Sequence, residues 1–170
     1  MMKRILIIGL QGSGKSTFAN KLGQSLDRKV IHLDKLYYRS GWQAVSKPEW
    51  QEILKEVTLQ KEWIIDGNYH SSLDARIELA DTIVFLNFPK WLCLFRAYKR
   101  SFKKDQPFDK AKGNNEKVSF DLIKKILRYP KNEVLNKLEK HKNTKKIFIL
   151  KNSNEAEALL IELEKNSSLL

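Results

Sequence analysis

One segment near the N-terminus combines glycine, lysine and hydroxyl side chains in a spacing that suits the binding of a phosphate chain. Residues 9–17, GLQGSGKST, fit the pattern G-x-x-x-x-G-K-[ST] in full. An apolar, strand-like run precedes the segment and a helical pattern follows it, and in this context backbone N–H groups and a helix N-terminus bind an anion. We predict that ATP binds here, through Gly9, Gln11, Gly12, Ser13, Gly14, Lys15, Ser16 and Thr17.

Two side chains of this segment and one later carboxylate have the chemistry of an ATP–Mg²⁺ site. Lys15 is expected to reach the β- and γ-phosphates, and the Ser16 hydroxyl is expected to ligate Mg²⁺. Asp66 ends the apolar run at residues 63–65, so it is predicted to hold Mg²⁺ directly or through water. The alternative for Asp66 is a carboxylate that only caps a turn.

Asp34 ends a second strand-like run, residues 30–33, and is a candidate catalytic residue. It could act as a base for an acceptor hydroxyl, orient the acceptor or help with Mg²⁺, or it could simply cap a helix or turn. His32 shares the alternate face of that run, and we expect it to be buried and hydrogen-bonded rather than catalytic. His70 could contact a ligand or lie in a solvated turn. No His/Cys spacing typical of a metal site is present.

Arginines are expected around the transferring group because phosphoryl transfer needs positive charge there. Arg76 is predicted on a helix that leaves the site after Asp66, and Arg96 and Arg100 share one face of a later helix. That helix leads into polar residues 103–117, a candidate lid that would exclude water. Each arginine could instead form a surface ion pair.

Four aromatic residues, Tyr37, Tyr38, Trp42 and Trp50, lie close together in the sequence and could stack on a base. Core packing is the commoner role of such residues.

Short apolar runs alternate with helical patterns along the chain. Predicted strands cover residues 3–9, 30–33, 63–65, 82–86 and 146–150. Predicted helices cover residues 15–25, 71–80, 89–102 and 154–165. Three more helices are predicted, one that begins at the capping-box sequence 46–49 and one on each side of residues 129–130. Residues 37–45 are predicted to form an aromatic-rich loop. This alternation predicts a three-layer α/β fold, a parallel sheet with helices on both faces. Ligands of such sheets bind beyond the carboxyl ends of the strands.

The length of 170 residues favours a single domain, with residues 35–61 as a candidate acceptor-binding insert and residues 103–143 as a basic lid and helical region. Residues 89–150 hold 18 of the 32 Lys and Arg residues but only six of the 20 Asp and Glu residues, which accounts for the net charge of +12. This basic stretch is either a surface for phosphates or nucleic acid, or a solvated lysine-rich face.

The chain is expected to be cytoplasmic, because no apolar run is long enough to cross a membrane and the single cysteine, Cys93, is predicted to be a buried, inert thiol. The oligomeric state is not predicted.

The sequence resembles the nucleoside monophosphate kinase-like P-loop proteins, adenylate kinases among them, and more closely the DNA topology modulation protein family related to them. The resemblance is carried by residues 9–17, 32–34, 41–42, 63–69, 76, 85–89 and 91–93. It implies ATP binding and a sheet of strand order 2-3-1-4-5. The sequence departs from adenylate kinases after Gly67, where Asn68-Tyr69-His70 replaces Phe-Pro-Arg and removes the arginine that grips the monophosphate. It departs from the closer family at Asn87, which is often Asp, at Ser40, which is often Pro, and in having fewer arginines in the basic stretch.

Two hypotheses about function follow. The favoured one is an ATP- and Mg²⁺-dependent kinase that transfers the γ-phosphoryl group to an unidentified small molecule or nucleotide. The alternative is a nucleotide-gated DNA-binding protein that affects DNA topology through residues 89–150, although no base-reading motif is present.

Overall fold

A five-stranded parallel sheet organises the protein in a computed structural model, which describes residues 2–102, 109, 111, 114 and 119–167. Its strands are β1 (Arg4–Gly9), β2 (Val30–His32), β5 (Trp63–Asp66), β6 (Thr82–Leu86) and β7 (Lys146–Leu150). They lie in the order β2-β5-β1-β6-β7, and neighbouring strands pair in parallel. Counted along the chain this is the order 2-3-1-4-5, so the prediction for the sheet is confirmed.

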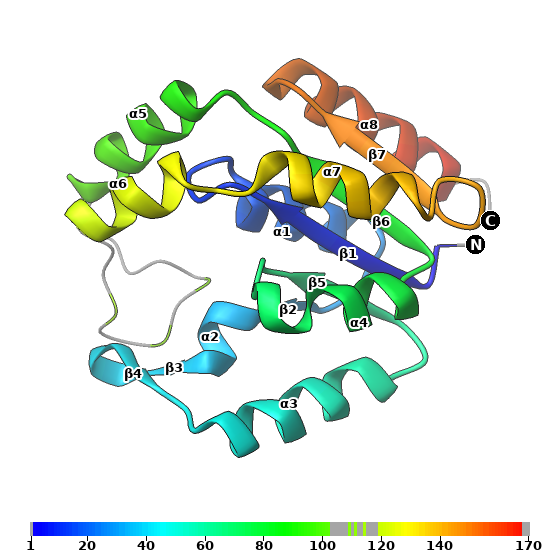
Figure 1. Ribbon diagram of the computed structural model, residues 1–170. Coiled ribbons are helices and arrows are strands. Elements are labelled where there is room, and N and C mark those ends of the chain that lie inside the picture. Colours follow the sequence, from blue (N-terminus) through cyan, green and yellow to red (C-terminus); the bar gives the residue numbers. More distant parts are fainter. Residues whose placement is uncertain (1, 103–108, 110, 112–113, 115–118, 168–170) are drawn as a thin grey trace.

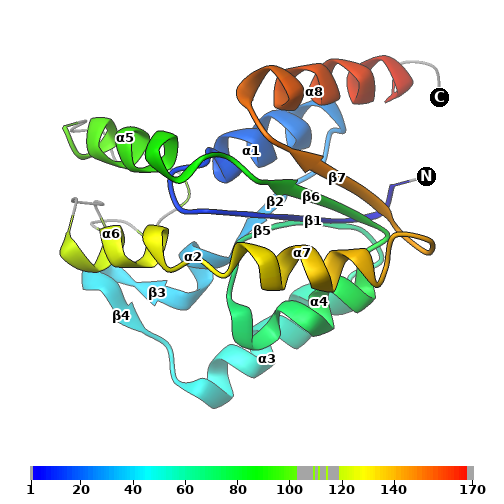
Figure 2. The same cartoon turned by 45° about the horizontal axis from the view of Figure 1, so that its top comes forward.

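Helices cover both faces of the sheet, as predicted for a three-layer α/β fold. One face carries α1 (Lys15–Ser25) and α8 (Ser153–Ser167), and the other carries α3 (Lys47–Leu59), α4 (Leu73–Leu79) and α7 (Lys131–Glu139) (Figures 1 and 2). The remaining helices, α2 (Leu33–Tyr37), α5 (Lys90–Ser101) and α6 (Phe120–Leu127), lie toward the carboxyl ends of the strands (Figure 2). This end of the sheet is therefore where a ligand is expected.

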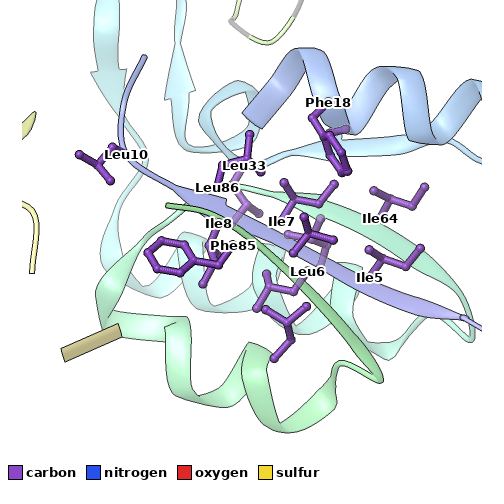
Figure 3. Packing of buried hydrophobic residues seen from close by; sticks show 14 of the residues in the cluster. Ile5, Leu6, Ile7, Ile8, Leu10, Phe18, Leu33, Ile64, Phe85 and Leu86 are labelled. Carbon is purple, nitrogen blue, oxygen red and sulfur yellow. The ribbon is translucent and has the colours of Figure 1, made fainter. Parts of the chain in front are cut away.

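The core follows from the position of each strand. All residues of β5 and β6 are buried, and so are all of β1 after Arg4, because helices pack on both sides of these central strands. The edge strands β2 and β7 are only partly buried. Figure 3 shows the β1 side chains beside Phe85 of β6 and Phe18 of α1, which is 4% exposed.

The capping sequence before α3 forms as predicted. The Ser46 side chain accepts a hydrogen bond from the Glu49 N–H at 3.3 Å, and Pro48 lies in the first turn. Trp50 and Val57 are the buried residues of this helix.

The structure corrects the prediction of a loop at residues 37–45. The second strand ends at His32, and α2 follows it at once, so Asp34 lies in the first turn of a helix rather than at a strand end. After α2, β3 (Tyr38–Arg39) and β4 (Gln43–Ala44) form a small antiparallel hairpin around a 3-10 turn. Burial explains the helix: Leu33 is fully buried, and Leu36 and Tyr37 pack against the core.

One further helix differs in its boundaries, and one prediction lies outside the described residues. The predicted helix at 71–80 begins with a 3-10 turn, His70–Ser72, and continues as the shorter α4. The candidate lid, residues 103–117, falls almost wholly outside the part of the chain that the structure describes.

Among the described residues, no helix has both the length and the apolar character needed to cross a membrane.

Candidate active site

The loop between β1 and α1 presents the N-terminus of α1 at the carboxyl edge of the sheet. Gly14 precedes the helix in the left-handed conformation, with φ 91°, and no side-chain hydrogen bond caps the helix. No acidic residue lies in its first turn either. The N-terminal N–H groups of this helix and its positive dipole end are thus arranged to receive an anion.

The polar side chains of this loop lie close to its backbone or are partly buried. Lys15 Nζ donates to the Leu10 carbonyl at 3.2 Å, so the ammonium group stays close to the loop. Ser13 Oγ and Gln11 Oε1 are buried and have no hydrogen-bond partner among the described residues. Buried polar atoms without partners are rare in folded proteins, and here they cluster where a polar ligand is predicted.

Gly12 fits the loop against α5 so closely that a side chain has no space. Its φ is +81°, and an added Cβ would lie 2.2 Å from the Cys93 carbonyl oxygen. Cys93 is fully buried, and burial raises the pKa of its thiol, so the predicted inert cysteine is confirmed as a buried one. The phosphate loop therefore rests directly on the first turn of α5.

Asp66 lies beside the phosphate loop because β5 pairs with β1. It ends β5 as predicted, is 4% exposed, and pairs in register with Ile7. The Nδ1–H of His32 donates to Asp66 Oδ2 at 3.0 Å, and the other ring nitrogen lies 2.9 Å from Asn20 Oδ1. The prediction that His32 is hydrogen-bonded is thus confirmed, and the residue is partly buried, with its side chain 9% exposed.

The second carboxylate oxygen of Asp66 is the feature that fits a metal ion. Oδ1 is buried and has no hydrogen-bond partner among the described residues. An unpaired buried carboxylate oxygen is unfavourable, and a hard cation such as Mg²⁺, or water bound to it, would satisfy it. The Ser16 hydroxyl, one residue after Lys15 in the first turn of α1, is the other ligand that the sequence predicts.

We expect Asp66→Asn to raise the Mg²⁺ concentration needed for half-maximal ATP binding by at least about tenfold, since an amide oxygen is a weaker ligand for Mg²⁺ than a carboxylate. Calorimetric titration of ATP at several Mg²⁺ concentrations measures this. Asp74→Asn is the matched control, because the Asp74 side chain is 71% exposed and pairs with Lys137. An unchanged Mg²⁺ requirement in Asp66→Asn would contradict the assignment.

Asp34 faces the aromatic side of the site. The Tyr69 hydroxyl donates to Asp34 Oδ1 at 2.9 Å, which ties α2 to the loop after β5. Burial, followed by the charge of Asp34, raises the pKa of the phenols of Tyr69 and Tyr38. Tyr69 therefore stays protonated and acts as a hydrogen-bond donor to Asp34.

An aromatic cluster, defined by Tyr37, Tyr38, Trp42, Trp50 and Tyr69, extends from this carboxylate to the surface. The ring of Tyr37 lies 4.8–5.0 Å from those of Tyr38, Trp50 and Tyr69, and Tyr38 lies 5.2 Å from Trp42. Trp50 is 6% exposed and belongs to the core, whereas Trp42 is 39% exposed. The cluster thus combines core packing at its inner end with exposed rings at its outer end.

Arg76, predicted to lie around the transferring group, is buried against the loop that follows β5. It is 1% exposed and donates to the carbonyls of Gly67, Asn68 and Tyr69, while its Nε donates to the Ser72 carbonyl. Burial lowers the pKa of this guanidinium to about 10, so it remains charged at neutral pH. In this structure its hydrogen bonds hold the loop of residues 67–69 in place.

Asn68 is a site residue that the sequence did not single out for a role. Its side-chain Nδ2 donates to the Gly9 carbonyl at 2.7 Å, and its Oδ1 accepts from the Gly9 N–H at 3.1 Å. The amide thereby pairs with the last residue of β1 and fixes the start of the phosphate loop. In the sequence, only its position directly after Asp66-Gly67, at the end of a predicted strand, weakly indicates a role for Asn68 in the site.

Of the other residues considered in the sequence, Arg96 contacts the phosphate loop and His70 is exposed. Arg96 donates to the Ser13 carbonyl at 3.1 Å and to Ser153 Oγ at 2.7 Å, so it joins the phosphate loop to the start of α8. Arg100 follows one helical turn later and is partly buried. His70 is exposed in the 3-10 turn, its ring 5.6 Å from that of Tyr129.

The same fold occurs in solved kinases. The chain aligns over 98% of its length with 93% of a shikimate kinase from Acinetobacter baumannii, solved in complex with shikimate, at a TM-score of 0.58 and 17% identity. A shikimate kinase from Bacteroides thetaiotaomicron aligns over 99% of both chains at a TM-score of 0.53 and 18% identity. The fold is therefore the three-layer α/β fold of P-loop NTPases, in the form that these kinases share.

The sequence is also similar to that of a curated protein. It is 29% identical over 106 residues to the uncharacterized protein YqaC of Bacillus subtilis (strain 168), a match that spans 61% of this chain and 60% of that protein. No protein-family model matches the chain. The predicted membership of the DNA topology modulation family accordingly stays a prediction.

Proposed function

We propose that this protein is a phosphotransferase that uses ATP and Mg²⁺ to phosphorylate a small molecule. The observation that carries the proposal is the unpaired Oδ1 of Asp66, buried on the strand next to a complete phosphate loop. The fold shared with the shikimate kinases supports the same class of reaction.

Each site residue has a proposed role that follows from its position. The backbone of residues 9–17 and the side chain of Lys15 bind the phosphates of ATP, as in other P-loop proteins. Ser16 and Asp66 would hold Mg²⁺, which neutralises phosphate charge when bound. Arg96 holds the loop through the Ser13 carbonyl. Arg96, and Arg100 one helical turn later in α5, would supply positive charge to the transferring group.

The test is transfer of the γ-phosphoryl group from labelled ATP to a panel of nucleosides, nucleotides and small metabolites. We expect labelled product from the unaltered protein and a loss of roughly 1000-fold or more in Lys15→Ala, since the lysine charge acts on the transferring group. Lys21→Ala on the same helix, outside the loop, is the control and should retain activity. Equal rates in Lys15→Ala and the unaltered protein would contradict the proposal.

The basic residues outside the site do not favour the DNA-binding alternative. Among the described residues of the stretch 89–150, several lysines already have partners within the chain: Lys90 with the Leu127 carbonyl, Lys137 with Asp74 and Glu133, Lys142 with Glu139, and Lys145 with the carbonyls of Glu78 and Ala80. Part of the positive charge of this stretch is therefore used in contacts within the protein.

A further inference from the structure

The aromatic cluster and Asp34 define the side of the site on which an acceptor would bind. Resting on the proposed function, we infer that the acceptor is an uncharged alcohol carried on a ring, such as a nucleoside or an unphosphorylated sugar, and that Asp34 is its catalytic base. Three observations lead to this chemical class: the negative charge of Asp34, the partners that the nearby arginines already have within the chain, and the aromatic side chains around Asp34.

The charge at Asp34 disfavours an anionic acceptor. The carboxylate is held in α2 by the Tyr69 hydroxyl, and its negative charge contributes to the raised pKa of both Tyr38 and Tyr69. A phosphate or carboxylate group placed among the same aromatic rings would meet this charge at short range, where the repulsion is strong. A neutral hydroxyl group could instead donate a hydrogen bond to the Asp34 carboxylate.

The two arginines of the segment that carries Asp34 and the aromatic cluster already have partners within the chain. Residues 34–76 lie wholly within the described part of the chain and contain two arginines, Arg39 and Arg76. Arg39 pairs with Glu49 at 2.6 Å on the surface, and Arg76 is buried against the backbone carbonyls of residues 67–69. To grip a phosphate with two hydrogen bonds, either guanidinium would first have to give up these contacts.

The aromatic cluster suits a flat or ring-shaped molecule. Tyr38 and Trp42 form its outer end, with ring centroids 5.2 Å apart and an interplanar angle of 72°. At its inner end Trp50, which is 6% exposed, has an Nε1 donor without a hydrogen-bond partner among the described residues. A buried indole N–H usually has a partner, so this unpaired donor adds a polar group to the inner end of the cluster.

The reaction balances with these groups alone. The acceptor oxygen attacks the γ-phosphorus as its proton passes to a carboxylate oxygen of Asp34, and the bond from the γ-phosphorus to the β–γ bridging oxygen breaks. The products are a phosphate monoester and ADP, and Asp34 then returns the proton to solvent. An acceptor that is already an anion would need no such base.

Matched pairs of acceptors test the charge preference. Adenosine with adenosine monophosphate, and ribose with ribose 5-phosphate, differ only in the phosphate group, and shikimate adds a carboxylate-bearing ring alcohol. We expect the neutral member of one pair to bind at least about tenfold more tightly by calorimetry without ATP, and to be the member phosphorylated when ATP and Mg²⁺ are added. Which pair responds distinguishes a nucleoside from a sugar.

Each outcome bears on one of the two proposals. Lys15-dependent transfer to a phosphorylated or carboxylated acceptor would support the phosphotransferase and overturn the neutral acceptor. Binding of a neutral member without transfer to any acceptor would contradict the phosphotransferase while supporting the assigned binding chemistry. Failure of both neutral members to bind would overturn the inference.

Asp34→Asn separates a base from a merely structural residue. The amide oxygen can still accept from Tyr69, so we expect neutral acceptors to bind almost unchanged while kcat falls by about 100- to 10,000-fold. Because a negative charge is removed, binding of the phosphorylated member should tighten by roughly tenfold. Asp74→Asn, at an exposed residue that pairs with Lys137, should change neither quantity. Unchanged kcat in Asp34→Asn would exclude it as the base.

Discussion

Replacing Gly12 by alanine is expected to reduce ATP affinity by about 100-fold or more, although the substitution adds only one methyl group. The added Cβ would lie 2.2 Å from the Cys93 carbonyl oxygen, and this neighbour is backbone that cannot rotate away. The positive φ of +81° adds strain of about 1–2 kcal/mol for a residue with a side chain. The loop must move away from α5, and its N–H groups then no longer converge on the phosphates.

Gly41→Ala is the control for this experiment. Gly41 also has a positive φ, +75°, but no atom lies within 4 Å of its added Cβ. It should show the backbone strain as a small loss of stability, with ATP affinity unchanged. Calorimetric ATP titration together with thermal unfolding of both variants separates strain from clash. Equal losses of ATP affinity in the two variants would show that packing against Cys93 is unimportant.

Replacing Arg76 by methionine is expected to cost roughly 3 kcal/mol or more of folding free energy and to abolish transfer. Methionine fills much of the volume but donates no hydrogen bonds, so buried carbonyls of residues 67–69 lose their partners, at about 1–3 kcal/mol each. These residues hold an unfavourable backbone, with Tyr69 at φ 35°. Once released, the loop no longer holds Asn68 on Gly9 or Tyr69 on Asp34.

Denaturant unfolding measures the loss of stability, and Arg39→Met is the matched control. Arg39 is an arginine with a 66% exposed side chain and a surface ion pair, which is worth at most about 1 kcal/mol. Arg76→Lys keeps the charge but not the planar set of donors, so it should recover little of the stability. A loss in Arg76→Met no larger than in Arg39→Met would show that the loop holds its conformation without the guanidinium.

Gly67 illustrates how this loop also sets the position of Asp34. An added Cβ at Gly67 would lie 2.9 Å from the Leu33 Cβ, and Leu33 is the first residue of α2. Asp34 follows it directly. Glycine at this position lets α2 approach the end of β5, so the position of Asp34 depends on the same loop that Arg76 supports.

The sequence was sufficient for the features that depend on neighbouring residues. The phosphate loop, its flanking strand and helix, the capping at Ser46 and the central apolar strands all follow from patterns a few residues long. A buried parallel strand is almost wholly apolar, and a helix often begins with a side chain that caps the backbone N–H three residues later. Both sequence patterns therefore lie within the segment whose structure they predict. Asp66 belongs to this group, because the strand that it ends was recognisable.

The tertiary structure alone decided the role of residues whose partners lie outside such patterns. Asn68 pairs with Gly9 across 59 positions, and His32 reaches Asp66 across 34. Residues 37–45 looked like a loop, yet packing of Tyr37 on Trp50 and Tyr69 orders the segment into a helix and a hairpin. Arg76 looked like a phosphate ligand by its type and position, but its burial and the carbonyls around it make it a support for the loop. Residue type gives the chemistry that a side chain can perform, whereas the long-range packing of the chain determines which group it meets.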